Sequence, residues 1–280
     1  MTPQYNDKLT EEQLREIQLE KIAQLRPIDD IFMRVLFRNN IPLAQYVLRI
    51  ITGIGDLFVI KEETQYDLER LVGVRSVCLD VMAEDSAGRK FNLEVQKPDN
   101  GASPKRARYH SSAMDVEYLS ASEDFDSLPI TYVIFITEND VLGKGWPIYT
   151  IDRMITNGEQ PFGFNDDQHI IYVNCAYRNE DDSSDLAKLI HDFCCNKADE
   201  MYLKILADET HLCKEIQKGE IEMCDVMEEY MEIVRRDDKI GAAIAFLQIG
   251  KNTHEEISKA LGLPLDLIEE LSKKYKPVSV

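Results

Sequence analysis

The feature that most constrains the fold of this chain is the run VCLDVMAEDSAGRKFNLEVQ at positions 77–96, in which a turn separates two strand-like segments. The residues Ser-Ala-Gly that end at Gly88 suit a three-residue hairpin loop, because glycine readily takes the left-handed conformation that closes it. Counting back along both strands places Asp80 opposite Glu94. Directly opposed residues share a face of the sheet, with Cβ atoms about 5 Å apart. A four-residue loop would break this register, so the prediction depends on Gly88.

Two facing carboxylates indicate either a metal site or an ordinary surface hairpin. Carboxylates held this close repel each other, and one pKa rises, unless a cation neutralises them. Mg²⁺ and Mn²⁺ use one or two carboxylates and keep several waters, and the backbone carbonyl of Val95 is a further candidate ligand. The alternative is a half-solvated hairpin whose second strand turns Asn92, Glu94 and Gln96 toward water and its apolar residues inward.

The rest of the chain predicts a mixed α/β core followed by helices. A capping-box pattern opens a helix at 10–25, and Asp29 or Asp30 can cap one longer helix that includes residues 31–52. Residues 59–69 are polar and extended at best. Strand signals cover residues 74–82, 90–96, 130–137, 148–153 and 169–175, and a helix is predicted over 104–119. This order is typical of a mixed sheet flanked by helices rather than of alternating βα units.

The helical pattern after residue 184 divides the chain into regions. We expect an N-terminal helix (1–26), an α/β core (27–183) and an all-helical C-terminal region (184–280). Two short helices at 253–274 resemble a helix-turn-helix pair. The second of them carries acidic residues that repel phosphates, so packing or oligomerisation is favoured over DNA reading. A homodimer is compatible with this pattern.

Composition and motifs exclude several classes of function. The net charge of −19 argues against a nucleic-acid-binding surface that covers the whole protein, although it allows a local basic channel. No apolar run approaches the roughly 18 residues of a membrane span, and the N-terminus has no signal-peptide pattern, so we expect a cytoplasmic protein without a membrane partner. The six cysteines lack zinc-site spacing and are expected to be reduced. The sequence has no phosphate-binding loop, dinucleotide motif or Ser/His triad pattern.

Four pieces of sequence in a fixed order carry a resemblance to a known family. They are IDDIFMRVLF at the start of a helix, Asp80, the NLEVQ segment with Glu94 and Gln96, and the KRARY segment that ends at Tyr109. Together they resemble the PD-(D/E)XK nuclease superfamily, and within it the recombination-promoting nuclease branch, often labelled a nuclease-family transposase. The resemblance covers roughly residues 25–180 and implies a restriction-endonuclease-like fold. It also implies a DNA endonuclease that uses Mg²⁺ or Mn²⁺.

The resemblance assigns roles to particular residues. Asp80 matches the metal-binding aspartate, Glu94 the second carboxylate, and Asp30 the acidic position of the first helix. Arg106 and Tyr109 match the following helix, where a cation can meet a phosphate. These matches predict catalytic residues Asp80, Glu94 and Gln96, metal ligands Asp80, Glu94 and Val95, and auxiliary or phosphate-binding residues Asp30, Arg106 and Tyr109.

One departure from the superfamily leaves alternatives open. Gln96 stands where the superfamily usually has lysine, and this branch commonly carries glutamine there. A neutral amide can orient water but brings no charge, so Arg106 or Lys105 is a candidate source of the missing charge. Lys97 is expected to point to the other face. The alternative functions are a catalytically weak or inactive nuclease-fold protein that binds DNA or protein, and a helical interaction protein with an accessory α/β domain.

Overall fold

The computed structural model describes residue 16 and residues 19–68, 78–97, 101–158, 160–216 and 239–275. These residues belong to two compact units, Met1–Ile221 and Glu222–Val280. Each unit is described by itself. Among the described residues, none of the helices combines the length and the apolarity that crossing a bilayer requires.

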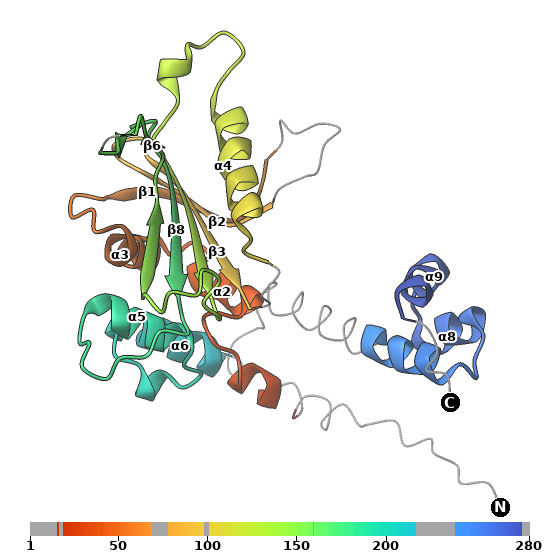
Figure 1. Ribbon diagram of the computed structural model, residues 1–280. Coiled ribbons are helices and arrows are strands. Elements are labelled where there is room, and N and C mark those ends of the chain that lie inside the picture. The colour runs from red at the N-terminus through yellow and green to blue at the C-terminus, as the bar shows by residue number, and fades with distance from the viewer. Residues whose placement is uncertain are drawn as a thin grey trace, which may run out of the picture. The chain divides into compact units, whose positions relative to one another are not determined.

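The first unit is built on a mixed six-stranded sheet of order β1-β2-β3-β4-β8-β5 (Figure 1). The antiparallel part is β1 to β3, the strands β3, β4 and β8 are parallel, and β5 returns antiparallel to β8. The strands are β1 (Val59–Asp67), β2 (Cys78–Asp85), β3 (Lys90–Gln96), β4 (Thr131–Thr137), β5 (Ile148–Ile151) and β8 (Gln168–Asn174), with a separate small sheet of β6 (Met154–Ile155) and β7 (Phe162–Gly163).

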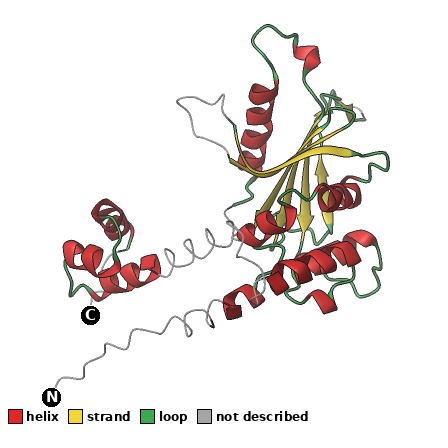
Figure 2. Cartoon of the chain, turned by 180° about the vertical axis from the view of Figure 1, so that it is seen from behind, coloured by secondary structure: helices red, strands yellow, loops and turns green. Residues whose placement is uncertain are grey.

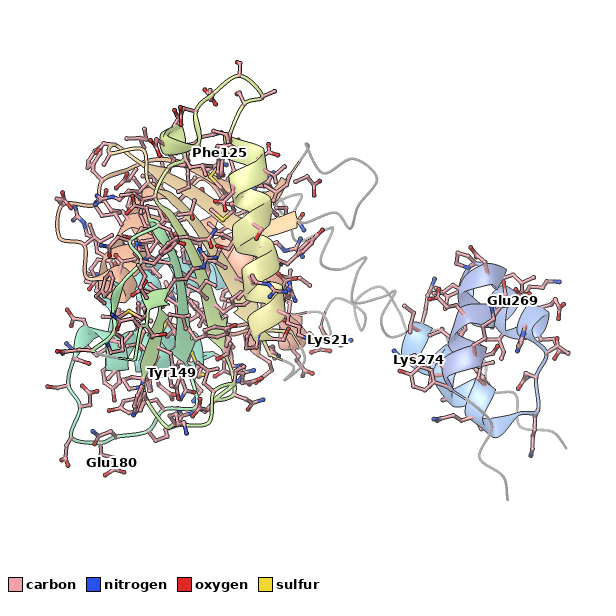
Figure 3. The ribbon with its side chains drawn as sticks, turned by 45° about the horizontal axis from the view of Figure 1, so that its top comes forward. Lys21, Phe125, Tyr149, Glu180, Glu269 and Lys274 are labelled. Atoms are coloured by element: carbon pink, nitrogen blue, oxygen red, sulfur yellow. The ribbon has the colours of Figure 1, made fainter. Side chains whose placement is uncertain are left out.

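Helices cover both faces of this sheet (Figure 2). On one face α2 and α3 contact the antiparallel strands, and on the other face α4 contacts β4 and β8. The apolar side chains beneath α4 form a buried cluster that includes Met114, Phe135 and Tyr172. Side chains fill the space between α4 and the sheet (Figure 3). The helices of this unit are α2 (Asp30–Phe37), α3 (Ile41–Thr52), α4 (Pro104–Tyr118), η1 (Phe125–Ser127), α5 (Asp185–Phe193), η2 (Ala198–Glu200) and α6 (Lys204–Ile216), with a helical segment at 19–23.

The predicted hairpin register is confirmed. Gly88 has φ 81° and its N–H donates to the Asp85 carbonyl at 2.9 Å, as a three-residue loop with a left-handed glycine requires. The ladder pairs Glu84 with Lys90 and continues to Val81 opposite Leu93. The next residues along this register are Asp80 and Glu94.

The predicted mixed α/β fold is confirmed, but the single helix expected over 31–52 is wrong. The chain forms α2 and α3 instead, because Asn39 takes a left-handed φ of 56° and Pro42 lies in the first turn of α3. The Asn40 side chain accepts the Leu43 N–H at 3.1 Å and so begins the new helix. The segment expected to be extended at best contains the edge strand β1.

The second unit contains the predicted helix pair, α8 (His254–Leu261) and α9 (Leu265–Lys274), preceded by a helical segment at 239–249. Thr253 and Glu256 form a capping box, and Gly262 ends α8 in the left-handed conformation. Ala243, Leu247, Ile257, Leu263 and Ile268 form a core of their own.

Several predictions concern residues outside this description or finer boundaries. Half of the helix expected at 10–25 lies outside the described residues. Helices α5 and α6 belong to the first unit. The division into 1–26, 27–183 and 184–280 stays a prediction.

Candidate active site

Asp80 and Glu94 meet where the regular β2–β3 ladder stops. The Asp80 N–H lies 3.4 Å from Glu94 Oε1, and the Val95 N–H donates to Asp80 Oδ2 at 3.2 Å. The Glu94 side chain on β3 therefore reaches the backbone of β2, and the Asp80 side chain on β2 reaches the backbone of β3. This arrangement holds both carboxylates at the end of β3, as the register predicted.

The polar face of β3 is not solvated. Asn92 and Glu94 are both 0% exposed, because α4 covers this side of the strand. This burial contradicts the alternative of a half-solvated hairpin with polar residues on a wet face. Burying an ionisable carboxyl group is costly unless it is paired or hydrogen-bonded, so these residues need partners.

Asp80 is electrostatically perturbed. Burial raises its pKa most, and the charges of Glu94 and Asp30 raise it further, to about 8. The Val95 N–H and the Arg106 guanidinium lower the pKa but only partly offset these effects. Asp80 therefore holds a proton at neutral pH unless a cation stabilises its charged form.

Arg106, in the first turn of α4, lies beside Glu94. Its Nη2 is 3.2 Å from Glu94 Oε2, and its Nη1 donates to the Gly101 carbonyl at 2.9 Å. Ser103 caps α4 and so fixes the start of the helix that carries Arg106. The Arg106 side chain is 38% exposed, so one edge of the guanidinium is available to solvent.

The other predicted residues occupy different positions around this pair. Asp30 begins α2 and pairs with the buried Arg34 at 3.5 Å, and its charge acts on Asp80. The Gln96 side chain lies against Gly101, which has room for it because it carries no Cβ. Tyr109 is 38% exposed on the outer side of α4. The structure thus brings Asp30, Asp80, Glu94 and Arg106 together and leaves Tyr109 at the surface.

Lys97 also has a defined partner. Its Nζ lies 2.5 Å from Asp29 Oδ1, at the cap of α2. Asp29 in turn lies near Arg26, whose guanidinium donates to Glu138. Lys97 is therefore tied to the acidic cap of α2.

The donor set at the end of β3 fits a hard divalent cation. Two facing carboxylates, one of them protonated because its charge is unfavourable, match the one or two carboxylates that Mg²⁺ uses. Within the part of the chain that the structure describes, no group of three or more His, Cys, Asp or Glu side chains is arranged for a metal. A cation held by these two carboxylates would need backbone oxygen and water to complete its coordination.

Sequence reasoning missed two members of the site, Asn92 and His110. His110 Nδ1 lies 3.4 Å from Glu94 Oε1 and 3.4 Å from Asn92 Nδ2, and Arg106 Nε donates to His110 Nε2 at 3.2 Å. The available signal was spacing. Asn92 is two residues from Glu94 on a strand, and His110 is four residues from Arg106 on a helix, so each shares a face with a predicted residue.

Comparison with known proteins identifies the family of the chain. Residues 54–245, more than half of the chain, match the family described as PD-(D/E)XK nuclease family transposase. The matched range contains both strands of the hairpin and all of α4. Neither the curated proteins nor the solved structures include a match to the chain.

Proposed function

Because the chain belongs to the PD-(D/E)XK nuclease family transposases, a nuclease-fold family, we propose that it is a divalent-metal-dependent DNA endonuclease. The observation that carries this proposal is the pair of facing carboxylates, the buried Glu94 and the half-buried Asp80, with Arg106 beside them. The reaction would be hydrolysis of a phosphodiester bond. The recombination or transposition role that the family name implies would use this cleavage.

The metal ligands would be Asp80, Glu94 and the Val95 carbonyl. Bound Mg²⁺ or Mn²⁺ supplies Lewis-acid chemistry, which polarises a phosphoryl oxygen and lowers the pKa of water. The protein's own part begins with Asp80, which must lose its proton before it can act as a ligand. Glu94 is already held in place by Arg106.

Arg106 would supply positive charge next to the reacting phosphate. A guanidinium has five N–H groups, and Arg106 directs one each to Glu94, His110 and Gly101. The remaining two N–H groups, one on Nη1 and one on Nη2, would be directed to the phosphate from this partly exposed side chain. Charge placed where negative charge develops is usually the largest catalytic contribution. Gln96 would orient the attacking water through its amide.

Gln96 also supports a second candidate function. Because its amide is neutral, the site lacks the lysine charge of the wider superfamily. Without that charge the protein would be an inactive or weak nuclease-fold protein that binds DNA or protein. Within the second unit, the α8–α9 pair would contribute packing, oligomerisation or DNA contact. A cytoplasmic location and a homodimer remain predictions.

The test is nicking of supercoiled plasmid by the full-length protein with Mg²⁺, with Mn²⁺ and with chelator. We expect cleavage only with metal, and a loss of at least 100-fold, on the order of an essential catalytic group, in Asp80→Asn and in Glu94→Gln. Asp208→Asn is the matched control, because Asp208 is an exposed aspartate on α6 paired only with Lys204 among its described contacts.

Three outcomes are informative. Loss of nicking in both site variants but not in the control supports the endonuclease. Equal nicking by wild type and both site variants means that the cleavage arises elsewhere. Metal binding by wild type without cleavage of any DNA form favours the non-catalytic alternative.

A further inference from the structure

Glu94 is held by a polar network that buries a histidine. His110 is 5% exposed and lies between three polar groups, the Asn92 amide, the Glu94 carboxylate and the Arg106 guanidinium. Its ring is also tilted against Phe135, with centroids 5.8 Å apart. A histidine used only for packing would not need polar atoms at both of its ring nitrogens.

The partners of His110 determine which nitrogen carries the proton. Arg106 Nε can only donate, so His110 Nε2, 3.2 Å away, must accept. A neutral imidazole that accepts at Nε2 carries its proton on Nδ1. That nitrogen lies 3.4 Å from Glu94 Oε1, within reach of an N–H donor. It also lies 3.4 Å from Asn92 Nδ2, so in this tautomer the Asn92 amide must present its oxygen, which has no other partner among the described residues, to the Nδ1–H.

The same network engages both oxygens of Glu94. Oε1 faces the Asp80 N–H and His110 Nδ1, while Oε2 faces Arg106 Nη2. The carboxylate plane is therefore fixed from two sides, by residues one helical turn apart on α4. A carboxylate that is already fixed does not have to be reoriented when it binds a metal. Residues that hydrogen-bond to a metal ligand raise the affinity of the site for the metal in this way.

We propose that His110 is a positioning residue that holds Glu94, through an Nδ1–H donor fixed by Arg106, in the orientation required of a metal ligand. The proposal rests on the proposed function, since it concerns the same site. It assigns His110 no contact with DNA and no proton transfer. The Arg106 guanidinium then has two roles. One edge of it fixes the His110–Glu94 pair, and the other edge faces the substrate.

The affinity of the full-length protein for Mn²⁺ tests this role without any cleavage. It can be measured by titration calorimetry and by the electron paramagnetic resonance signal of unbound Mn²⁺. We expect His110→Phe to weaken binding roughly 10- to 100-fold, the range found when a group behind a metal ligand is removed. His110→Asn, whose amide can donate from near the Nδ1 position, should recover most of the affinity. Met114→Leu is the matched control, because Met114 is also buried on α4 but contributes no polar atom.

Denaturant midpoints separate positioning from damage to the fold. Weaker Mn²⁺ binding in His110→Phe, at a midpoint within the range of Met114→Leu, supports the proposal. Unchanged affinity in His110→Phe overturns it. Equal losses in His110→Phe and His110→Asn also overturn it, because a donor to Glu94 would then not be the decisive feature.

The tautomer of His110 provides a readout that needs no metal. Long-range ¹H–¹⁵N correlation on the metal-free wild type should show the Nδ1–H form, the opposite of the form that predominates in free histidine. The protein has five histidines, so the signal missing from His110→Asn identifies residue 110. An Nε2–H tautomer overturns the proposal. If the Nδ1–H tautomer is found but the protein binds no Mn²⁺, the contact by which His110 orients Glu94 is supported. The metal-dependent function proposed above is then contradicted.

Discussion

At the scale of single residues, Asp80 has a direct link between protonation and metal binding. Its pKa is raised from 3.8 to about 8, first by burial and then by the negative charges of Glu94 and Asp30. A ligand carboxylate must be deprotonated, so a metal that binds at neutral pH has to displace this proton.

The first prediction concerns that proton. At pH 7 a group with a pKa near 8 is mostly protonated, so binding of Mn²⁺ should release about 0.9 proton per ion. Calorimetry in buffers of different ionisation enthalpy measures this number directly. Release should fall toward zero above pH 9 and should be absent in Asp80→Asn. Proton release that is independent of pH would contradict the assignment of the raised pKa to Asp80.

The sign for stability follows from the same shift. Because the folded state binds this proton more tightly than the unfolded state, the metal-free protein loses stability as the pH rises from about 4 to about 8. Asp80→Asn has no such proton to lose. Its free energy of unfolding should therefore gain on that of wild type across this window, with the difference levelling off above it. Urea denaturation at three pH values without divalent metal checks the trend.

The second prediction concerns Gly101, which lies against Gln96 and offers its carbonyl to Arg106. A Cβ at position 101 would occupy the place of the Gln96 amide. Gly101→Ala should therefore displace Gln96 and slow cleavage roughly 10- to 100-fold, as expected when a positioned group is moved. Mn²⁺ affinity, which rests on other residues, should change little.

A double-mutant cycle provides the control for this effect. If Gly101 acts through Gln96, the pair Gly101→Ala with Gln96→Ala should lose no more activity than Gln96→Ala alone. Additive losses would show that the alanine disturbs something else, such as the Arg106 contact with the Gly101 carbonyl.

Predictability differs from residue to residue within the site. The facing of Asp80 and Glu94 follows from a local turn and a period of two, so the sequence was sufficient. The burial of Asn92 and His110 depends on where α4 packs, which no local pattern encodes. His110 also differs from the apolar residues that predict a buried face, so its place on the buried face of α4 became clear only in three dimensions.

At the scale of elements, the β2–β3 hairpin depends on one backbone conformation. Gly88 has φ 81°, and a Cβ there would meet no atom within 4 Å. Gly88→Ala should therefore cost about 1 kcal/mol of unfolding free energy through backbone strain alone. Gly55→Ala is the control, since Gly55 has equal room and no positive φ, and its effect should stay within about 0.5 kcal/mol. Equal effects of the two substitutions on the urea midpoint would contradict this origin.

The elements themselves were predictable where the pattern was regular. The strands β3, β4 and β8 match the expected ranges closely, because β3 alternates polar and apolar residues and the buried parallel strands β4 and β8 contain continuous apolar runs. The break between α2 and α3 was missed since apolar spacing continues across Arg38 and Asn40, and the dihedral angle of Asn39 outweighs it. The edge strand β1 was undervalued because one side of an edge strand can be polar.

At the scale of the whole molecule, a net charge of −19 must be reconciled with the phosphate-bearing substrate of the proposed function. Lys105 and Arg108 are exposed in the first turns of α4, next to Arg106. A local pair of cations beside the site can steer a polyanion even when the rest of the protein repels it. We therefore expect α4 to be the side by which duplex DNA approaches.

The fourth prediction measures this contact through its salt dependence. Lys105→Ala with Arg108→Ala should weaken binding to a short duplex and reduce the slope of log affinity against log salt by about 2, one for each lost phosphate contact. Lys197→Ala with Lys204→Ala is the control, since both lysines are exposed and paired with Glu200 and Asp208. Fluorescence anisotropy over a range of NaCl gives both slopes. Equal slopes in the two double variants would place the DNA on another surface.

The hairpin has a consequence for the order of folding. The residues of the candidate site lie close together in the sequence, whereas the sheet is complete only when β8 and β5 join it. They are Asp80, Glu94, Gln96, Gly101, Arg106 and His110. Contacts between residues near in sequence cost the least loop-closure entropy and form early. The repelling carboxylates and the α4 residues that restrain them can therefore assemble as one local event, with Asp30 as the distant addition. On this topology the candidate site is encoded in one short stretch of sequence, and the later strands complete the sheet.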